Sequence, residues 1–122
     1  MSSGVFDSMI VIDALNGIQG ATAALEAAES PAISVVTWIE VMLGFRESAF
    51  EAEGRRFLTG FDLVPLSEGV AEEAVRIRRE RRLKLPDAII LATSRHLGLP
   101  LLTRNTKDFD PGDPMIRVPY TV

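Results

Sequence analysis

The hydrophobic positions of the chain fall into short apolar runs that alternate with longer segments of helical periodicity. Runs of strand length lead us to expect strands at 5–6, 32–34, 62–64, 101–103 and 116–118. Helical periodicity predicts helices at 9–15, 21–29, 35–45, 48–58, 68–82 and 86–97. This alternation favours a parallel sheet with helices on both faces. We therefore expect an α/β fold: a single domain, residues 1–122, around a central parallel sheet of four to five strands.

Turn and cap residues define several of these predicted boundaries. Ser67 is a good N-cap for the helix that follows it, and Gly98 suits the residue just past the end of a helix. Pro31 is expected to break the helix before it. Pro86 fits the first turn of a helix, where its missing N–H is no loss.

One acid lies among apolar residues and gives the clearest indication of function. Asp87 falls in the first turn of the predicted 86–97 helix, and the apolar run 88–92 follows it directly. A charge at the entrance to a core is costly unless it is paired, hydrogen-bonded or bound to a metal. Asp7 and Glu40 lie in equally apolar stretches. Three such carboxylates indicate a site for a hard cation.

The predicted topology would bring these acids to one edge of the sheet. Asp7 ends the first predicted strand, Thr103 ends a later one, and Glu40 lies on the helix after the 32–34 strand. In open parallel sheets, binding sites lie beyond the carboxyl ends of the strands. We therefore expect these side chains to converge in one cleft.

Composition narrows the class of protein. A chain of 122 residues with 47% hydrophobic and 25% charged residues is typical of a folded domain rather than a disordered one. The absence of cysteine excludes disulfides, thiolate metal sites and cysteine nucleophiles. No apolar run has the length of a membrane span, and the N-terminus lacks the features of a signal peptide. We expect a cytoplasmic protein that does not bind a membrane.

Charge is unevenly distributed along the chain. The net charge of −4 argues against general attraction to nucleic acid. However, six of the thirteen basic residues lie between Arg76 and Lys84. Such a run is typical of a solvated helix face, and it also fits an edge that contacts phosphates. Arg82, close to Asp87 in sequence, is therefore a candidate substrate contact.

Four segments resemble, in order, the sequence blocks of the PIN-domain family. Residues 6–17 are similar to the opening block, in which the acid is Asp7 here. Residues 33–40 resemble the second block, which ends at Glu40, and residues 84–93 closely match the third, which contains Asp87. Residues 101–109 are similar to the fourth. This short form is most similar to the VapC-type toxins of bacterial toxin–antitoxin pairs.

The resemblance implies a Mg²⁺-dependent endoribonuclease that acts as the toxin of such a pair. A metal-activated water would hydrolyse RNA phosphodiester bonds. Asp7, Glu40 and Asp87 would form the acidic core and hold Mg²⁺, for which Mn²⁺ can substitute. RNA would be the substrate, a cognate antitoxin would block the acids, and the toxin would form a homodimer.

The last block departs from the family pattern at a position that affects metal binding. Asn105 stands where the family often has a fourth acid, and its neutral carbonyl oxygen would hold a second metal more weakly. Asp108 either compensates as a further catalytic acid or caps a short turn. Thr103 and Arg104 are candidates for substrate contact or for support of the site, with a purely structural role as the alternative. The opening block also departs at Met9, where a small polar residue is usual.

The identity of the first acid has an alternative. Residues 10–13 can also form a strand that ends in an acid, which would make Asp13 the first catalytic residue. We prefer Asp7, because the residues after it follow the spacing of the opening block.

Two other functions remain open at this point. One is a receiver-like, Mg²⁺-dependent phosphorylation switch, which needs an aspartate at the end of the middle strand, where Val64 meets Pro65. The other is a catalytically inactive PIN-like module that holds RNA or a partner without cutting, which Asn105 would favour.

Overall fold

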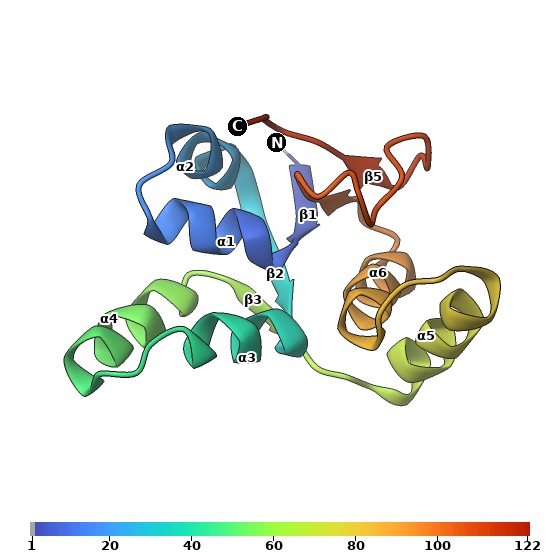
Figure 1. Cartoon of the computed structure of the whole chain (residues 1–122), viewed down its shortest axis with the longest axis horizontal. Coiled ribbons are helices and arrows are strands. Elements are labelled where there is room, and N and C mark those ends of the chain that lie inside the picture. Colours follow the sequence, from blue (N-terminus) through green and yellow to red (C-terminus); the bar gives the residue numbers. More distant parts are fainter. Residues whose placement is uncertain (1) are drawn as a thin grey trace.

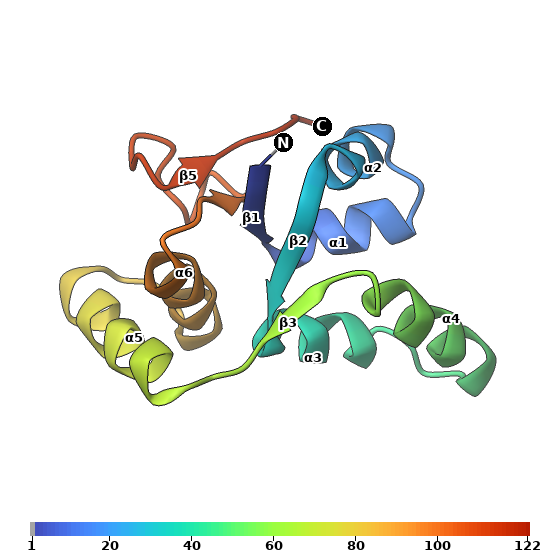
Figure 2. The same ribbon diagram turned by 180° about the vertical axis from the view of Figure 1, so that it is seen from behind.

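The computed structural model describes residues 2–122, apart from the side chains of Ser2 and Ser48. In this range the elements in chain order are β1 (Ser2–Phe6), α1 (Ser8–Leu15), α2 (Gln19–Glu26), β2 (Ala28–Ser34), α3 (Val35–Leu43), α4 (Ser48–Leu58), β3 (Asp62–Val64), α5 (Glu68–Glu80), α6 (Leu85–Leu97), β4 (Leu101–Leu102) and β5 (Ile116–Arg117). Figures 1 and 2 show the strands in the middle of the molecule, with α1 to α4 on one side and α5 and α6 on the other.

The sheet has five strands in the order β3-β2-β1-β4-β5, and every neighbouring pair is parallel. The predicted α/β class and parallel sheet of four to five strands are therefore confirmed. The first strand, β1, lies at the centre, with β2 on one side and β4 on the other. Consequently the segments that follow β1, β2 and β4 all leave the sheet at the same edge.

Alternating side chains of the strands face two separate cores. Val5 and Leu101 pack into a cluster with the inner faces of α5 and α6. Phe6 and Ile33 point to the opposite face and pack with α1, α2 and α4. This follows from the two-residue repeat of a strand, in which successive side chains point to opposite faces. Because both faces are covered, the central strands are apolar on both sides.

The structure corrects the predicted boundary at Pro31. The residue was expected to break a helix, but α2 already ends at Glu26 and Pro31 lies inside β2, opposite Gly4 of β1. Pairing with β1 holds this segment extended, an interaction that the local sequence does not contain. The other predicted helices begin and end within two residues of the observed ones.

The predicted helix caps are confirmed. The Ser67 side chain accepts a hydrogen bond from the Val70 backbone N–H at the start of α5. Gly98 ends α6 in the left-handed conformation, with φ of 68°. A side chain at this φ would be strained, which is why glycine suits the position.

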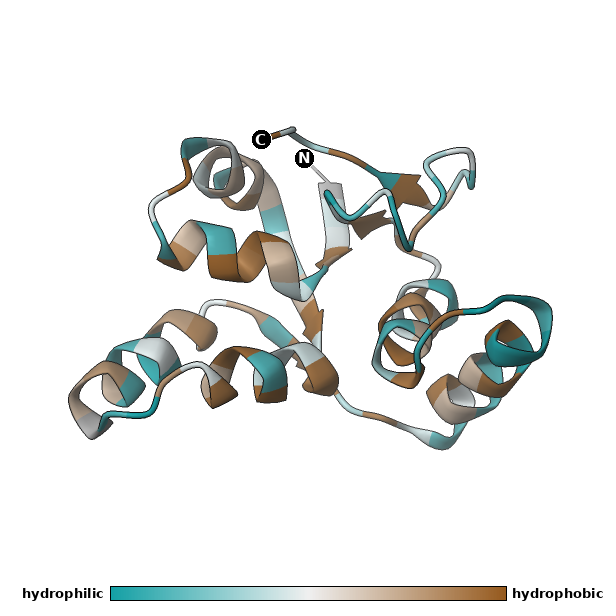
Figure 3. Ribbon diagram, in the orientation of Figure 1, coloured by the Kyte–Doolittle hydropathy of each residue, from teal (hydrophilic) through white to brown (hydrophobic). Residues whose placement is uncertain are grey.

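The helices differ in their hydropathy. Figure 3 shows α1 and α3 mostly hydrophobic and α5 mostly hydrophilic.

Among residues 2–122, no single helix is long and apolar enough to cross a membrane, although α1 and α2 together meet these criteria as a pair bent by 113°.

Candidate functional site

Asp7 is held at the point where β1 passes into α1. Its side chain is buried, with 4% of its surface exposed. One carboxylate oxygen accepts the backbone N–H of Ser8 at 2.8 Å, and the other accepts the hydroxyl of Thr103 at 2.7 Å. Thr103 is itself fully buried directly after β4. Two neighbouring strands of the sheet therefore fix the orientation of this carboxylate.

Burial and like charges make Asp7 hard to ionise. Burial is the largest cause and raises the pKa of Asp7 to about 6, from an ordinary value of 3.8. The hydrogen bonds from Thr103 and Ser8 lower the pKa, whereas the charges of Asp87 and Glu40 raise it further. The three acids that the sequence singled out are thus close enough to repel one another.

Ser8 hydrogen-bonds to both Asp7 and Glu40. The Ser8 hydroxyl donates to a Glu40 carboxylate oxygen at 2.5 Å, and it lies 3.1 Å from the buried hydroxyl of Thr37. Thr37 and Glu40 are one helical turn apart on α3. Thr37 therefore supports the acidic site.

Asp87 lies in the first turn of α6, near these acids. Its pKa is raised, first by burial and then by the charges of Asp108 and Glu40, while nearby Lys84 lowers it. Within residues 2–122, neither Asp87 nor Glu40 forms an ion pair with an arginine. An internal salt bridge therefore does not explain why these carboxylates lie here.

Asn105 and Asp108 form a short turn at the rim of the site. The Asn105 side-chain amide donates to the Asp108 carboxylate at 2.9 Å, and its carbonyl oxygen accepts the Asp108 backbone N–H at 3.4 Å. The Asn105 backbone N–H donates in turn to the Thr103 hydroxyl. Asn105 thus caps this turn, and the nearby charge of Asp108 raises the pKa of Asp87. A catalytic role for Asp108 stays a prediction.

The donor chemistry of this cluster suits Mg²⁺. Asp7 and Asp87 supply hard oxygen ligands, and each is destabilised in its charged form by neighbouring acids that a cation would neutralise. In the part of the chain that the structure describes, no three acidic or histidine side chains are close enough to hold one ion between them. Mg²⁺ commonly uses only one or two protein carboxylates and keeps several waters, so two acids suffice.

Arg104 has a different environment from the one predicted for a substrate contact. Its guanidinium donates to both carboxylate oxygens of Asp13, at 2.5 and 3.0 Å. The Tyr120 hydroxyl donates to the same carboxylate at 2.6 Å. The hydrogen bond from Arg104 holds the pKa of Asp13 below its ordinary value. This cluster ties α1, the segment after β4 and the C-terminal segment together.

Asp13 itself lies in α1, where residues 10–13 are helical, so the alternative in which they form a strand is wrong. Sequence reasoning gave no role to Ser8 or Tyr120. Ser8 has a local signal, because it directly follows Asp7 in the opening block. Tyr120 has none, since its contact with Asp13 spans 107 residues.

Some arginines of the run 76–84 already have hydrogen-bond or ion-pair partners within the protein. Arg78 donates to the Leu83 carbonyl oxygen, and Arg81 forms an ion pair with Asp113 at 2.8 Å. Arg79 and Arg82 are exposed. Arg82 therefore keeps its predicted role as a candidate substrate contact.

The chain has clear similarity to known proteins. The family model for the PIN domain matches residues 5–110. A structure of a toxin–antitoxin complex from Klebsiella pneumoniae contains a chain with 45% sequence identity and a TM-score of 0.91, and the match covers 98% of this chain and 99% of that one. VapBC2 from Rickettsia felis, bound to a DNA fragment from its promoter, gives 17% identity and a TM-score of 0.80 over 98% of both chains. FitAcB from Neisseria gonorrhoeae gives 22% identity and a TM-score of 0.77, over 94% of this chain and 96% of that one. No significant match is found among curated proteins.

Proposed function

The chain belongs to the PIN-domain family, and we propose that it is a Mg²⁺-dependent endoribonuclease, the toxin of a toxin–antitoxin pair. One observation carries the proposal. Asp7, Glu40 and Asp87 come from three separate segments, lie at one edge of the sheet and raise one another's energy. An enzyme tolerates such a cluster where function needs it, because strongly perturbed acids are commoner at active sites than elsewhere.

The residues of the site have distinct proposed roles. Asp7 and Asp87 hold the cation through carboxylate oxygens, and Glu40 adds negative charge beside them. Thr103 and Ser8 fix the Asp7 carboxylate in one orientation by donating to its two oxygens. Mg²⁺ held there would supply a water ligand of lowered pKa and positive charge beside the phosphate. Asn105 orients Asp108 at the rim.

The proposed partners follow from the same family membership. The chain resembles, over nearly its whole length, a chain of a toxin–antitoxin complex, which supports a cognate antitoxin as partner. We propose that the antitoxin blocks the acids, that RNA is the substrate, that the toxin is a homodimer and that it acts in the cytoplasm.

A cleavage assay tests the proposal. Purified protein is incubated with a structured RNA pool in Mg²⁺ or in EDTA, beside the Asp7→Ala and Asp87→Ala variants. Asp62→Ala, an exposed acid at the start of β3, is the matched control. We expect cleavage by the wild type and the control in Mg²⁺ only. Cleavage that persists in EDTA, or in both site variants, would refute the metal-dependent mechanism.

Of the two alternative functions, the receiver-like switch is excluded and the inactive binding module is kept as a second candidate. A receiver-like switch would have the flavodoxin-like strand order 2-1-3-4-5, but the observed order is β3-β2-β1-β4-β5 and Val64 is followed by Pro65, so this alternative is wrong. An inactive PIN-like binding module is the second candidate, because the Asn105 amide donates a hydrogen bond to the Asp108 carboxylate. Mg²⁺-independent RNA binding by a wild type that cuts no RNA would favour it.

A further inference from the structure

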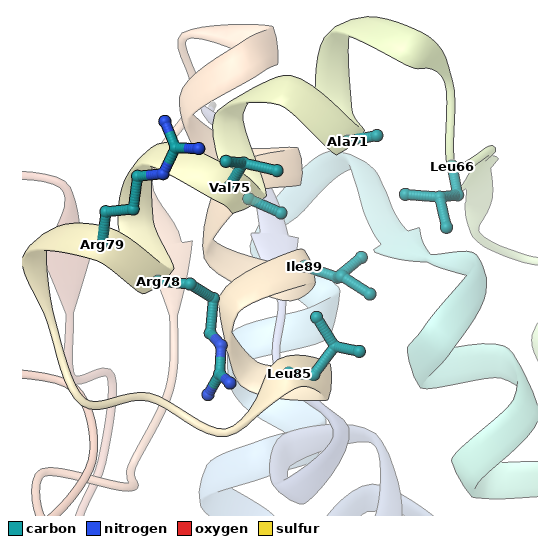
Figure 4. Close-up of a pocket in the computed structure, with 8 residues that line it drawn as sticks. Leu66, Ala71, Val75, Arg78, Arg79, Leu85 and Ile89 are labelled. Atoms are coloured by element: carbon teal, nitrogen blue, oxygen red, sulfur yellow. The ribbon is translucent and has the colours of Figure 1, made fainter.

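The segment that joins α5 to α6 carries two basic side chains on its outer side. Arg82 and Lys84 are exposed, and Leu83 between them is buried, with 6% of its surface exposed. The Leu83 carbonyl oxygen accepts a hydrogen bond from Arg78. Figure 4 shows Arg78 reaching from α5 toward this segment, with Leu85 at the start of α6 beside it. The two basic side chains are therefore presented to solvent by a segment that is anchored at Leu83.

Lys84 lies beside the acidic site. It directly precedes α6, and its carbonyl oxygen accepts the backbone N–H of Ala88 at 2.9 Å, so it belongs to the same helical turn as Asp87. Its charge is close enough to lower the pKa of Asp87. Within residues 2–122, neither Lys84 nor Arg82 forms an ion pair. Both cations can therefore meet a ligand without giving up a partner in the protein.

A lysine at this position does not favour the helix that follows it. The residue before a helix stabilises it when a side-chain oxygen accepts a free backbone N–H, as Ser67 does for α5. Among the residues that the structure describes, Lys84 makes no such hydrogen bond to α6. Its positive charge also lies at the positive end of the helix dipole. A residue that breaks these local rules beside a candidate site is more readily explained by function than by folding.

We propose that Lys84 and Arg82 bind two neighbouring phosphates of an RNA strand, next to the phosphate at the acidic site. The backbone is extended at Arg81 and at Lys84, and two residues of extended chain cover about 6–7 Å. Neighbouring phosphates of a single RNA strand are separated by a similar distance. Lys84 is nearer to Asp87 and takes the phosphate beside the one that is cut, and Arg82 takes the next. Such contacts position a strand without reading its sequence.

This inference rests on the proposed function, because it assigns how the same site holds its substrate. The chain has a net charge of −4, so attraction to a polyanion must come from local groups of cations. A substitution at one of them should then remove a measurable share of the affinity. RNA binding and RNA cleavage are measured separately below, so that failure of this inference is distinguishable from failure of the proposed function.

The salt dependence of RNA binding tests the proposal. A labelled single-stranded RNA is titrated at several salt concentrations with the Asp7→Asn protein, in which the RNA is not cut, and with Lys84→Ser, Lys84→Arg and Arg82→Ser added to it. Each lost phosphate contact should reduce the slope of log affinity against log salt by about 0.7. We expect this reduction in both serine variants, with binding at least about threefold weaker at low salt. Lys84→Arg keeps the charge and should keep the slope.

Two controls separate an RNA contact from an effect on folding. Arg56→Ser, which replaces an exposed arginine on α4, should bind RNA as its parent does. Lys84→Ser places a favourable capping residue before α6, so its melting temperature should not fall. Weaker binding by a protein that is no less stable excludes misfolding as the cause.

Cleavage by the otherwise wild-type protein gives a second readout. A phosphate contact away from the reacting atoms holds the substrate and the transition state alike, so Lys84→Ser should raise KM and leave kcat unchanged. An unchanged affinity and salt slope in Lys84→Ser would overturn the inference, even if the wild type cuts RNA. A shifted pH profile of cleavage with an unchanged slope would also overturn it, because Lys84 would then act through Asp87. A reduced slope in a protein that cuts no RNA would support the contact and refute the nuclease.

Discussion

Asp7 and Asp13 both belong to α1, one as its N-cap and the other in its last turn, but their pKa values are shifted in opposite directions. The pKa of Asp7 is raised to about 6, chiefly by burial, with the acids Asp87 and Glu40 adding to the effect. The pKa of Asp13 is lowered, chiefly by the hydrogen bond from Arg104. Both side chains are nearly inaccessible to solvent, with 4% and 7% of the residue exposed.

The neighbours of each carboxylate separate a structural acid from a candidate functional one. Asp13 meets a guanidinium and a phenol hydroxyl that the fold itself supplies, so its charge is compensated in the protein alone. Among the described residues, the Asp7 carboxylate accepts two hydrogen bonds and lies near further carboxylates, so no cationic side chain there compensates its charge. The exposed fraction alone does not distinguish the two residues.

The largest expected effect is on catalysis. Asp7→Asn keeps the shape of the side chain but removes its charge, and we expect RNA cleavage to fall at least about 100-fold. Asp13→Asn should leave cleavage within a few-fold of the wild type. Initial rates on one RNA, with both proteins shown to be folded, measure this. Loss of cleavage in Asp13→Asn with full activity in Asp7→Asn would make Asp13 the first acid after all.

The second effect concerns the pH dependence of stability in EDTA. Because folding raises the pKa of Asp7, its contribution to stability is greatest below 3.8 and is lost as the pH rises through about 6. Asp7→Asn lacks this loss, so it should gain on the wild type between pH 4 and pH 7, by up to about 3 kcal/mol. Urea unfolding at several pH values measures the gap, and a gap that stays constant would contradict the raised pKa.

Addition of Mg²⁺ should reverse this behaviour. A cation that binds the ionised carboxylate stabilises the folded protein, so the melting temperature of the wild type should rise with Mg²⁺ at pH 7 and rise less at pH 5. Asp7→Asn should show a smaller rise at pH 7. Equal rises in the two proteins would place the cation elsewhere.

The third effect is loss of stability in Asp13→Asn, by about 2 kcal/mol at neutral pH, because the partly exposed Arg104 loses its charged partner. The lowered pKa of Asp13 means that its contribution is present above 3.8 and is lost as the pH falls through the folded value. The wild type and the variant should therefore converge in stability in strong acid. Urea unfolding from neutral pH to strong acid measures this, and a difference that persists in acid would show that packing rather than charge is responsible.

The fourth effect is smaller and returns to Asp7. Thr103→Val removes the hydroxyl that donates to Asp7 and leaves the volume nearly unchanged, so we expect a loss of about 1 kcal/mol in stability. It should also raise the pKa of Asp7 further and shift the pH profile of cleavage upward. Thr106→Val, exposed in the same loop, is the control. An unchanged pH profile would mean that Thr103 does not tune Asp7.

The smallest effect is expected for Tyr120→Phe, which removes one hydrogen bond to Asp13 and leaves Arg104 in place. We expect a loss of about 0.5–1 kcal/mol by thermal unfolding, with cleavage unchanged. A loss as large as that of Asp13→Asn would mean that the tyrosine, rather than the arginine, compensates this acid.

Most helices and strands could be predicted from local sequence. The apolar runs predicted where they lie, and Ser67 and Gly98 predicted helix ends because capping depends on neighbouring residues. Pro31 was misjudged because its extended conformation comes from pairing with β1. The contact between Arg104 and Asp13 could not be predicted, because the two residues lie 91 positions apart in the sequence.

The fold class, the carboxyl ends of β1, β2 and β3 and the acids that follow them could be predicted from the sequence, since parallel strands place their carboxyl ends at one edge of the sheet. Which of the acids has its charge compensated depends on the tertiary structure. Asp7 and Asp13 are the same residue type in similarly apolar surroundings along the chain. What differs is which side chains, from β4, α6 and the C-terminal segment, lie beside each of them, and charge compensation depends on those distances in space.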